Sequence, residues 1–186
     1  MTTLQAIESR RSIKEFADRP VAREELERLL EAAVQAPNHR MTQPWRFYVL
    51  GPEARGAYGA ALGARKAKRV EDPDAARQVV EKVERSHVSL PAMLAVSMVL
   101  DENPEIREED YAATFMAIQN LTLAAVDAGL GTHLKTGAVM EDPHAREAVG
   151  VPEGERIVAI VEIGEPAATP GAKDRKPASE LTTWVP

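Results

Sequence analysis

Apolar residues recur at helical spacing in several parts of the chain. Pro37 ends one such pattern over residues 22–36, whose apolar positions are Leu26, Leu29, Leu30, Ala33 and Val34. Further helices are predicted over residues 3–10, 73–86, 109–128 and 143–149. Residues 53–65 are rich in Ala and Gly and predict only a weak helix.

Three other segments have the composition of strands. RFYVL, residues 46–50, combines aromatic and β-branched side chains, and AMLAVSMVL, residues 92–100, is an apolar run that fits a buried strand. RIVAIVEIG, residues 156–164, is the third. Because helices and separated strands do not alternate regularly, an α+β fold is predicted instead of a doubly wound one.

The segment 109–128, EDYAATFMAIQNLTLAAVDA, is apolar around nearly its whole circumference. Such a helix is expected to be buried on all sides, either in the centre of the fold or against a partner subunit. Gly129 provides a helix stop.

The length of 186 residues suits one globular domain, residues 1–186. Within it, residues 165–186 contain four prolines and no core periodicity, so we expect an extended C-terminal tail. The start MTTLQAIESRR lacks the pattern of a signal peptide, and no apolar run is long enough to span a membrane. A cytoplasmic location is the expectation.

Composition removes several classes of site. The absence of cysteine rules out disulfides, iron–sulfur clusters and thiolate zinc sites. The four histidines lie far apart without an H-E-x-x-H motif, so no metal centre is expected. A net charge of −6 argues against general nucleic-acid binding, although it leaves room for a local cluster of positive charge.

Two basic groups are candidates for such a cluster. Arg10, Arg11 and Ser12 could hold an anion, because arginine forms bidentate bonds to phosphate and a hydroxyl adds a neutral donor. The simpler alternative is a solvated helix end. Lys173 and Arg175 could close the other side of a phosphate site, or belong to a mobile linker.

Two loops could contact a planar ligand. APNHRMTQPW, residues 36–45, is stiff and rich in donors, but it could equally be an ordinary turn with Trp45 in the core. GLGTHLKTG, residues 129–137, begins as a glycine-rich loop after a helix, so it is not a dinucleotide fingerprint. A helix cap explains Gly129, while Lys135 could reach a polarised ring oxygen.

Taken in order, four stretches resemble the FMN-dependent nitroreductase family, and in particular its small branch with an A-P-[ND]-H loop. They are SRRSIKEF, LLEAAVQAPNHRMTQPWRFYVL, AGLGTHLKTGA and VGVPEGERIVAIVEIGEP. The resemblance covers nearly the whole chain. It implies a nitroreductase-like fold, with a central, mostly antiparallel sheet flanked by helices, and an intertwined homodimer that holds two FMN molecules at its interface.

The resemblance also implies which residues bind FMN. Arg10 and Ser12 match positions at the phosphate and ribityl chain, with Arg11 beside them, and the tail positions Lys173 and Arg175 add phosphate contacts. The remaining matches concern the ring and the reductant. Gln35 and His39 match positions that come from the partner subunit, Leu134, Lys135 and Thr136 match the lining of the isoalloxazine ring, and residues 124–129 match a stretch linked to the nicotinamide nucleotide.

The activity implied by the resemblance is a ping-pong reaction. NADH or NADPH delivers hydride to flavin N5, and a nitroaromatic, quinone or similar acceptor then takes the same place and is reduced. The flavin carries the chemistry, so no catalytic side chain is assigned. Two alternatives remain open: a reductase of another substrate on the same fold, such as an enal, a dehalogenation substrate or free flavin, and a non-catalytic FMN-binding dimer.

Overall fold

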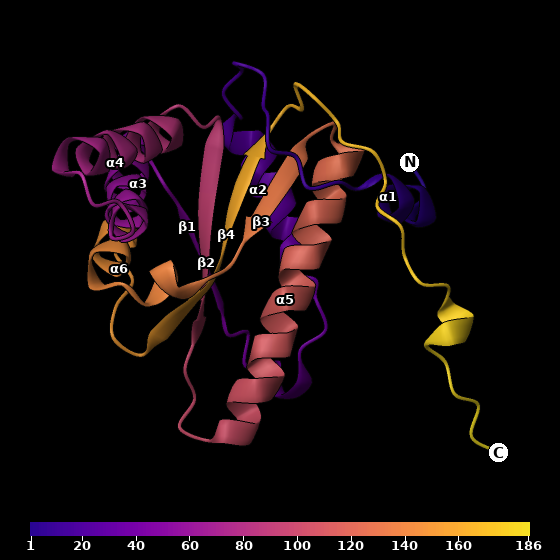
Figure 1. Ribbon diagram of the computed structural model, residues 1–186. Coiled ribbons are helices and arrows are strands. Elements are labelled where there is room, and N and C mark those ends of the chain that lie inside the picture. The colour runs from indigo at the N-terminus through magenta and orange to yellow at the C-terminus, as the bar shows by residue number, and fades with distance from the viewer.

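The three segments with strand composition pair with one another and with a fourth strand in one sheet (Figure 1). The computed structural model describes all residues, 1–186. The strands are β1 (Trp45–Val49), β2 (Ala92–Val99), β3 (Gly131–Lys135) and β4 (Glu155–Gly164). Their order is β1-β2-β4-β3, and every neighbouring pair is antiparallel. The predicted α+β class and mostly antiparallel sheet are confirmed.

Strand β3 corrects the prediction of a glycine-rich loop over residues 129–137. Gly129 does end the preceding helix with a positive φ of 74°, but the chain enters the sheet two residues later. There it pairs only with β4, which lies more than 20 residues further along the chain. The sequence GTHLK has no alternating apolar pattern, so only this distant partner identifies it as a strand.

Five of the six α-helices cover the two faces of the sheet, and α1 lies beside α5 (Figure 1). On one side lie α2 and α5, and on the other lie α3, α4 and α6. The bounds are α1 (Thr3–Ser9), α2 (Arg23–Ala33), α3 (Pro52–Ala67), α4 (Pro73–Val88), α5 (Pro104–Asp127) and α6 (Pro143–Val149). Short 3-10 helices occupy His39–Met41 (η1), Ala138–Glu141 (η2) and Ala178–Glu180 (η3).

Helix α3 is longer and more regular than its Ala- and Gly-rich sequence predicts. It packs closely on α4: a Cβ atom added to Gly63 would lie 2.8 Å from the Cα of Val80. Small residues weaken the intrinsic helix preference but allow two backbones to approach. The tertiary contact therefore outweighs the weak local signal.

The continuous apolar run of β2 reflects burial on both faces of the sheet. Leu94 and Val96 point toward α2 and α5, while Met93 and Ala95 point toward the opposite layer. All four side chains are completely buried. Alternation between apolar and polar positions is absent because neither face of this strand meets water.

Helix α5 is only partly covered within one chain. Ala117, Ile118 and Leu121 are buried against the sheet, but Tyr111 and Met116 are each about two-fifths exposed, at 39% and 40%. The prediction of burial on all sides is therefore incomplete in a single chain. Whether a partner subunit covers the rest stays a prediction.

The chain after β4 passes α1 and leaves the body of the molecule (Figure 1). Its last residues include three strongly exposed apolar side chains, Leu181, Trp184 and Val185. No helix combines the length and the apolar character needed to cross a bilayer.

Candidate functional site

The segment after α1 is held against the free edge of β3. A capping box at Thr2 and Gln5 starts α1, and after the helix ends the chain becomes extended. Ser12 forms a parallel bridge with Thr132, and the Ile13 amide donates to the Thr132 carbonyl at 2.9 Å. The Ile13 side chain is buried, so the flanking polar residues, Ser12 and Lys14, are left exposed.

The beginning of the tail runs beside this same segment. The Ala17 amide donates to the Glu165 carbonyl at 2.8 Å, and the Ala167 amide donates to the Glu15 carbonyl at 3.0 Å. Phe16 and Pro166 form an antiparallel bridge between the two segments. This pairing directs the residues after Ala167 back along the N-terminal segment, toward Arg10.

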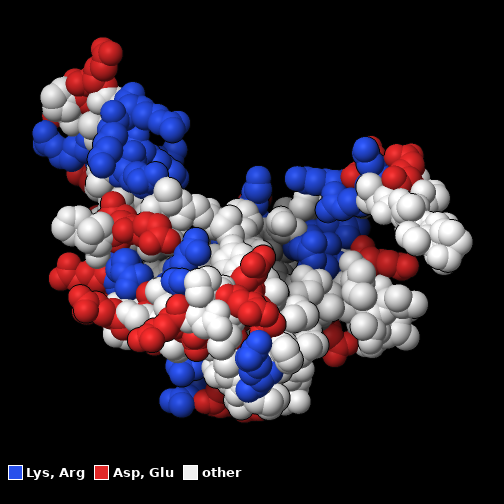
Figure 2. Space-filling view, turned by 90° about the horizontal axis from the view of Figure 1, so that it is seen from below, with Lys and Arg blue, Asp and Glu red and all other residues white.

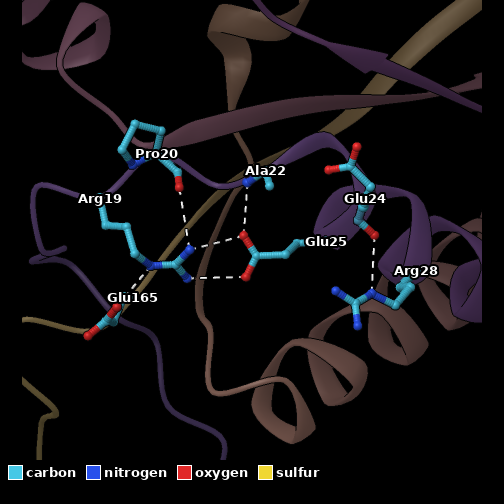
Figure 3. A network of polar contacts seen from close by, with 7 residues as sticks. All are labelled: Arg19, Pro20, Ala22, Glu24, Glu25, Arg28 and Glu165. Atoms are coloured by element: carbon cyan, nitrogen blue, oxygen red, sulfur yellow. Dashed lines mark hydrogen bonds and ion pairs between the residues drawn. The ribbon is translucent and has the colours of Figure 1, made fainter.

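An ion network fixes the far end of the same pairing (Figure 3). The Arg19 guanidinium donates to Glu165 Oε2 at 2.9 Å and to both oxygens of Glu25 at 3.0 and 3.2 Å. Glu25 also accepts from the Ala22 amide at 2.8 Å. The bonds from Arg19 and Ala22 lower the pKa of Glu25, and the two carboxylates raise the pKa of Arg19. The network joins the start of α2 to the start of the tail.

Between the N-terminal segment and the tail lies a cavity of about 380 Å³. Its lining contains five cationic side chains and one carboxylate, that of Glu15. The complete lining is Arg10, Arg11, Ser12, Lys14, Glu15, Ala168, Thr169, Pro170, Gly171, Lys173 and Arg175.

None of these five cations forms an ion pair within the chain. The side chains of Arg11 and Arg175 donate only to backbone carbonyls, and those of Arg10, Lys14 and Lys173 make no hydrogen bond. Lys and Arg also gather in separate groups on the face seen in Figure 2, with mixed or uncharged surface between them. Crowded and unpaired cations repel one another, so this donor set fits a multiply charged anion such as a phosphate ester.

The structure therefore brings together five of the residues that the sequence indicated: Arg10, Arg11, Ser12, Lys173 and Arg175. It adds Lys14, which the sequence analysis did not single out. The available signal was its position four residues after Arg10, on the same extended segment.

Leu134, Lys135 and Thr136 lie outside this cavity, on β3 and just after it. Leu134 and Thr136 are exposed. Lys135 pairs with the Glu162 carboxylate on β4, which is 4% exposed and also contacts His133 Nδ1 at 3.1 Å. Glu162 was missed, although it is the one charged residue in the apolar sequence IVAIVEIG. It holds the Lys135 ammonium against the sheet.

Gln35 and His39 lie elsewhere in the chain, in the loop after α2. Both are exposed, and His39 Nδ1 contacts Glu109 Oε1 on α5 at 3.1 Å. Trp45, at the end of this loop, lies in the core with 6% exposure, as the simpler reading of the loop predicted.

Within one chain, His39 and the cationic cavity lie at opposite ends of α5. Glu109 holds His39 near the start of the helix, whereas the amino group of Met1 contacts Asp127 in its last turn at 2.6 Å. The helix is about 27 Å long between Glu109 and Asp127 at a rise of 1.5 Å per residue. One mononucleotide cannot reach both places in a single chain.

Residues 124–129 lie at the end of α5 and in the turn that follows it. Ala125 is buried, and the Leu130 amide donates to its carbonyl at 2.8 Å. This bond ties the end of α5 to the start of β3. The neighbouring residues Ala124, Asp127 and Ala128 line a separate shallow hollow with Glu25 and Arg28.

Comparison with known proteins gives consistent results. The sequence profile of the nitroreductase family matches residues 7–165. A Bacillus subtilis (strain 168) protein named "Putative NAD(P)H nitroreductase YfhC" is 36% identical over 177 residues, covering 95% of this chain and 91% of the relative. The similarly named YdjA of Escherichia coli (strain K12) is 30% identical over 167 residues, covering 89% of each chain.

Solved structures agree at the level of the fold. A nitroreductase-like family protein from Bacillus cereus superposes with a TM-score of 0.86 at 31% identity, covering 100% of this chain and 96% of the other. A mutant of the FMN and NADPH-dependent nitroreductase NfnB from a Sphigopyxis strain gives a TM-score of 0.80 at 22% identity, covering 99% of both chains.

Proposed function

The chain belongs to the nitroreductase family, and from this membership we infer that it is an NAD(P)H-dependent oxidoreductase with FMN as its cofactor. We further propose that it reduces a nitroaromatic, a quinone or a similar acceptor. Reductant and acceptor would bind in turn at one place, giving ping-pong kinetics.

The cationic cavity is the observation that carries this proposal. FMN ends in a doubly charged phosphate. Although the net charge of the chain is −6, five cations without ion pairs surround this one cavity. Its two walls come from opposite ends of the sequence and meet through the pairing of residues 15–17 with 165–167. The donor set therefore supports a phosphate site.

Tasks are proposed for the five cavity residues that the sequence indicated. Arg10, Lys173 and Arg175 would neutralise the phosphate, and the Ser12 hydroxyl would donate a further hydrogen bond near the ribityl chain. Arg11 is oriented by two backbone carbonyls, those of Glu8 and Arg10, so it would act mainly through its charge.

The ring of the cofactor requires a different lining. We propose that Leu134, Lys135 and Thr136 on and after β3 line it, with Glu162 holding the Lys135 ammonium in place. When bound, FMN supplies the capacity to accept a hydride and pass it on. The protein residues bind and orient it, and none is assigned as nucleophile or general base.

We propose that the complete site is built by two copies of the chain. His39 could join the cavity only from a second copy, because it lies at the other end of α5. We assign Gln35, in the same loop, to the second copy as well. Tyr111 and Met116 on α5 and Leu181 and Trp184 in the tail supply exposed apolar area for such a homodimer.

Anaerobic reduction of the purified protein tests the proposal. The protein should bind added FMN, and its visible flavin absorbance should bleach when NADH or NADPH is added without oxygen. The colour should return on addition of a nitroaromatic or a quinone.

Other outcomes of the same experiment would refute specific parts of the proposed function. A protein that ignores FMN would exclude every flavin-dependent function. Bound flavin that never bleaches would indicate a carrier. Bleaching without reoxidation by nitroaromatics or quinones would point to a different acceptor on the same fold.

A further inference from the structure

The loop that carries His39 has an unusual backbone. Arg40, Met41 and Gln43 have φ values of 63°, 52° and 45°, in the left-handed region that residues with a Cβ rarely adopt. No glycine relieves this conformation. Three left-handed non-glycine residues in four positions persist only where surrounding contacts hold them.

Helix α5 supplies those contacts through two neighbouring carboxylates. Glu109 binds two side chains of the loop, with Oε1 at 3.1 Å from His39 Nδ1 and Oε2 at 3.2 Å from Arg40 Nε. Asp110 is 3% exposed and accepts from the Thr42 hydroxyl. The loop thus lies against the first turns of α5 (Figure 1).

A second set of bonds closes the loop on itself. Asn38 Oδ1 accepts from the Gln43 amide at 2.6 Å, and Asn38 Nδ2 donates to the Thr42 hydroxyl at 3.0 Å. The loop is therefore a closed unit fastened to α5 at three side chains, His39, Arg40 and Thr42.

The contact with Glu109 also decides the chemistry of the imidazole. Hydrogen bonds from His39 and Arg40 lower the pKa of Glu109, so the carboxylate is ionised at neutral pH and can only accept. Nδ1 must then carry the proton. In the neutral ring, Nε2 is left as an acceptor on a side chain that is 71% exposed.

We propose that Glu109 is a positioning residue for His39: it fixes the Nδ1–H tautomer and the direction of the ring, so that Nε2 presents an acceptor to the flavin bound by a second copy of the chain. This inference rests on the proposed function, because the flavin and the partner belong to it. Asp110 supports the same arrangement through Thr42.

Histidine NMR on the purified protein without FMN tests the first half. The protein contains only four histidines, so the ring nitrogens of His39 can be assigned with a His39→Asn variant. Spectra are recorded over a series of pH values, and the neutral ring of His39 should be in the Nδ1–H form. Glu109→Ala should shift it toward the Nε2–H form. Glu109→Gln should do the same, because Arg40 can only donate and takes the amide oxygen, which leaves the amide NH2 as a donor to Nδ1.

FMN affinity tests the second half. Glu109→Ala should raise the dissociation constant for FMN about tenfold, the effect expected when one positioned hydrogen bond is lost. Glu109→Gln should weaken binding in the same direction, because it favours the tautomer in which Nε2 is a donor. Glu108→Ala is the matched control, since Glu108 is an exposed neighbour on the same helix without an ion pair, and it should change neither readout.

The outcomes separate the two proposals. If Glu109→Ala keeps the wild-type tautomer, or keeps the wild-type affinity for FMN, the positioning role is refuted while the flavin function stands. If the wild-type protein binds no FMN, the proposed function fails, and the flavin contact of His39 fails with it even where the tautomer depends on Glu109.

Discussion

Gly131 is the residue at which the N-terminal segment approaches β3 most closely, and its substitution tests how the candidate site is assembled. A Cβ atom at this position would lie 2.4 Å from Ile13 Cγ1, 2.9 Å from Ile13 Cβ and 3.0 Å from Pro166 Cγ. Real Cβ atoms essentially never come closer than 3.0 Å to another heavy atom. Ile13 is 3% exposed, and because its Cβ is bonded directly to the backbone, a change of rotamer cannot remove the 2.9 Å contact.

The expected change in the free energy of unfolding of Gly131→Ala follows from two opposing effects. Overpacking a closed position costs about 1–3 kcal/mol, while replacing glycine by alanine stiffens the unfolded chain and returns about 0.4–1 kcal/mol. Gly131→Ala should therefore lower the free energy of unfolding by about 1–2 kcal/mol. Gly171→Ala is the control, because nothing lies within 4 Å of a Cβ atom there.

Urea unfolding at one fixed protein concentration measures the effect. The midpoint for Gly131→Ala should fall by about 0.3–2 M with an unchanged slope, since urea slopes are typically about 1–3 kcal/mol per molar. Combining Gly131→Ala with Ile13→Ala should cost less than the sum of the single changes, because the second change removes Ile13 Cγ1, the atom in the shortest contact. A Gly131→Ala protein as stable as wild type would show that residues 12–16 do not dock on β3 as described.

Three further predictions concern the site, the interface and acid stability. Arg10→Ala should weaken FMN binding by about 2–4 kcal/mol, or roughly 30- to 1,000-fold in the dissociation constant. A fluorescence titration with Arg65→Ala as the control measures this, and equal affinities would contradict the assigned phosphate site. Met116→Glu should give folded monomers in sedimentation velocity, whereas Ile118→Glu should disrupt folding, because Ile118 is only 1% exposed within the chain's own core. A stable dimer of the Met116 variant would exclude this face of α5 from the interface. Burial lowers the pKa of His87 below its usual value near 6.5, so the unfolded chain binds a proton that the folded chain does not, and stability should fall as the pH drops below that value. His87→Gln should flatten this part of a urea-midpoint profile against pH, and an unchanged profile would assign the acid sensitivity to other groups.

Much of the fold could be read from local patterns. Helix α6 begins at Pro143 and ends at Val149, as predicted, and the apolar runs of β2 and β4 appear as strands within a residue or two of their predicted bounds. These elements carry their own signals: a proline at the first helical position, or an apolar run of strand length. Strand β3 and the full length of α3 have no such signal. They exist because β4 and α4 lie beside them.

The candidate site divides in the same way. Composition and spacing marked Arg10, Arg11, Ser12, Lys173 and Arg175 as two basic groups, but nothing in the order of residues says that they face one cavity. That follows from the pairing of Glu15 and Ala17 with Ala167 and Glu165, a contact between chain segments about 150 residues apart. Such a pairing depends on where β3 and β4 have already placed both segments.

The sequence by itself determined the class of the fold, most of the helices and the cationic character of the proposed phosphate ligands, because periodicity and side-chain charge are local properties. Only the tertiary structure decided that Glu162 holds Lys135, that Glu109 holds His39, and that His39 and Arg10 lie at opposite ends of α5. Distances between residues remote in sequence depend on how the layers pack, and no local pattern encodes them.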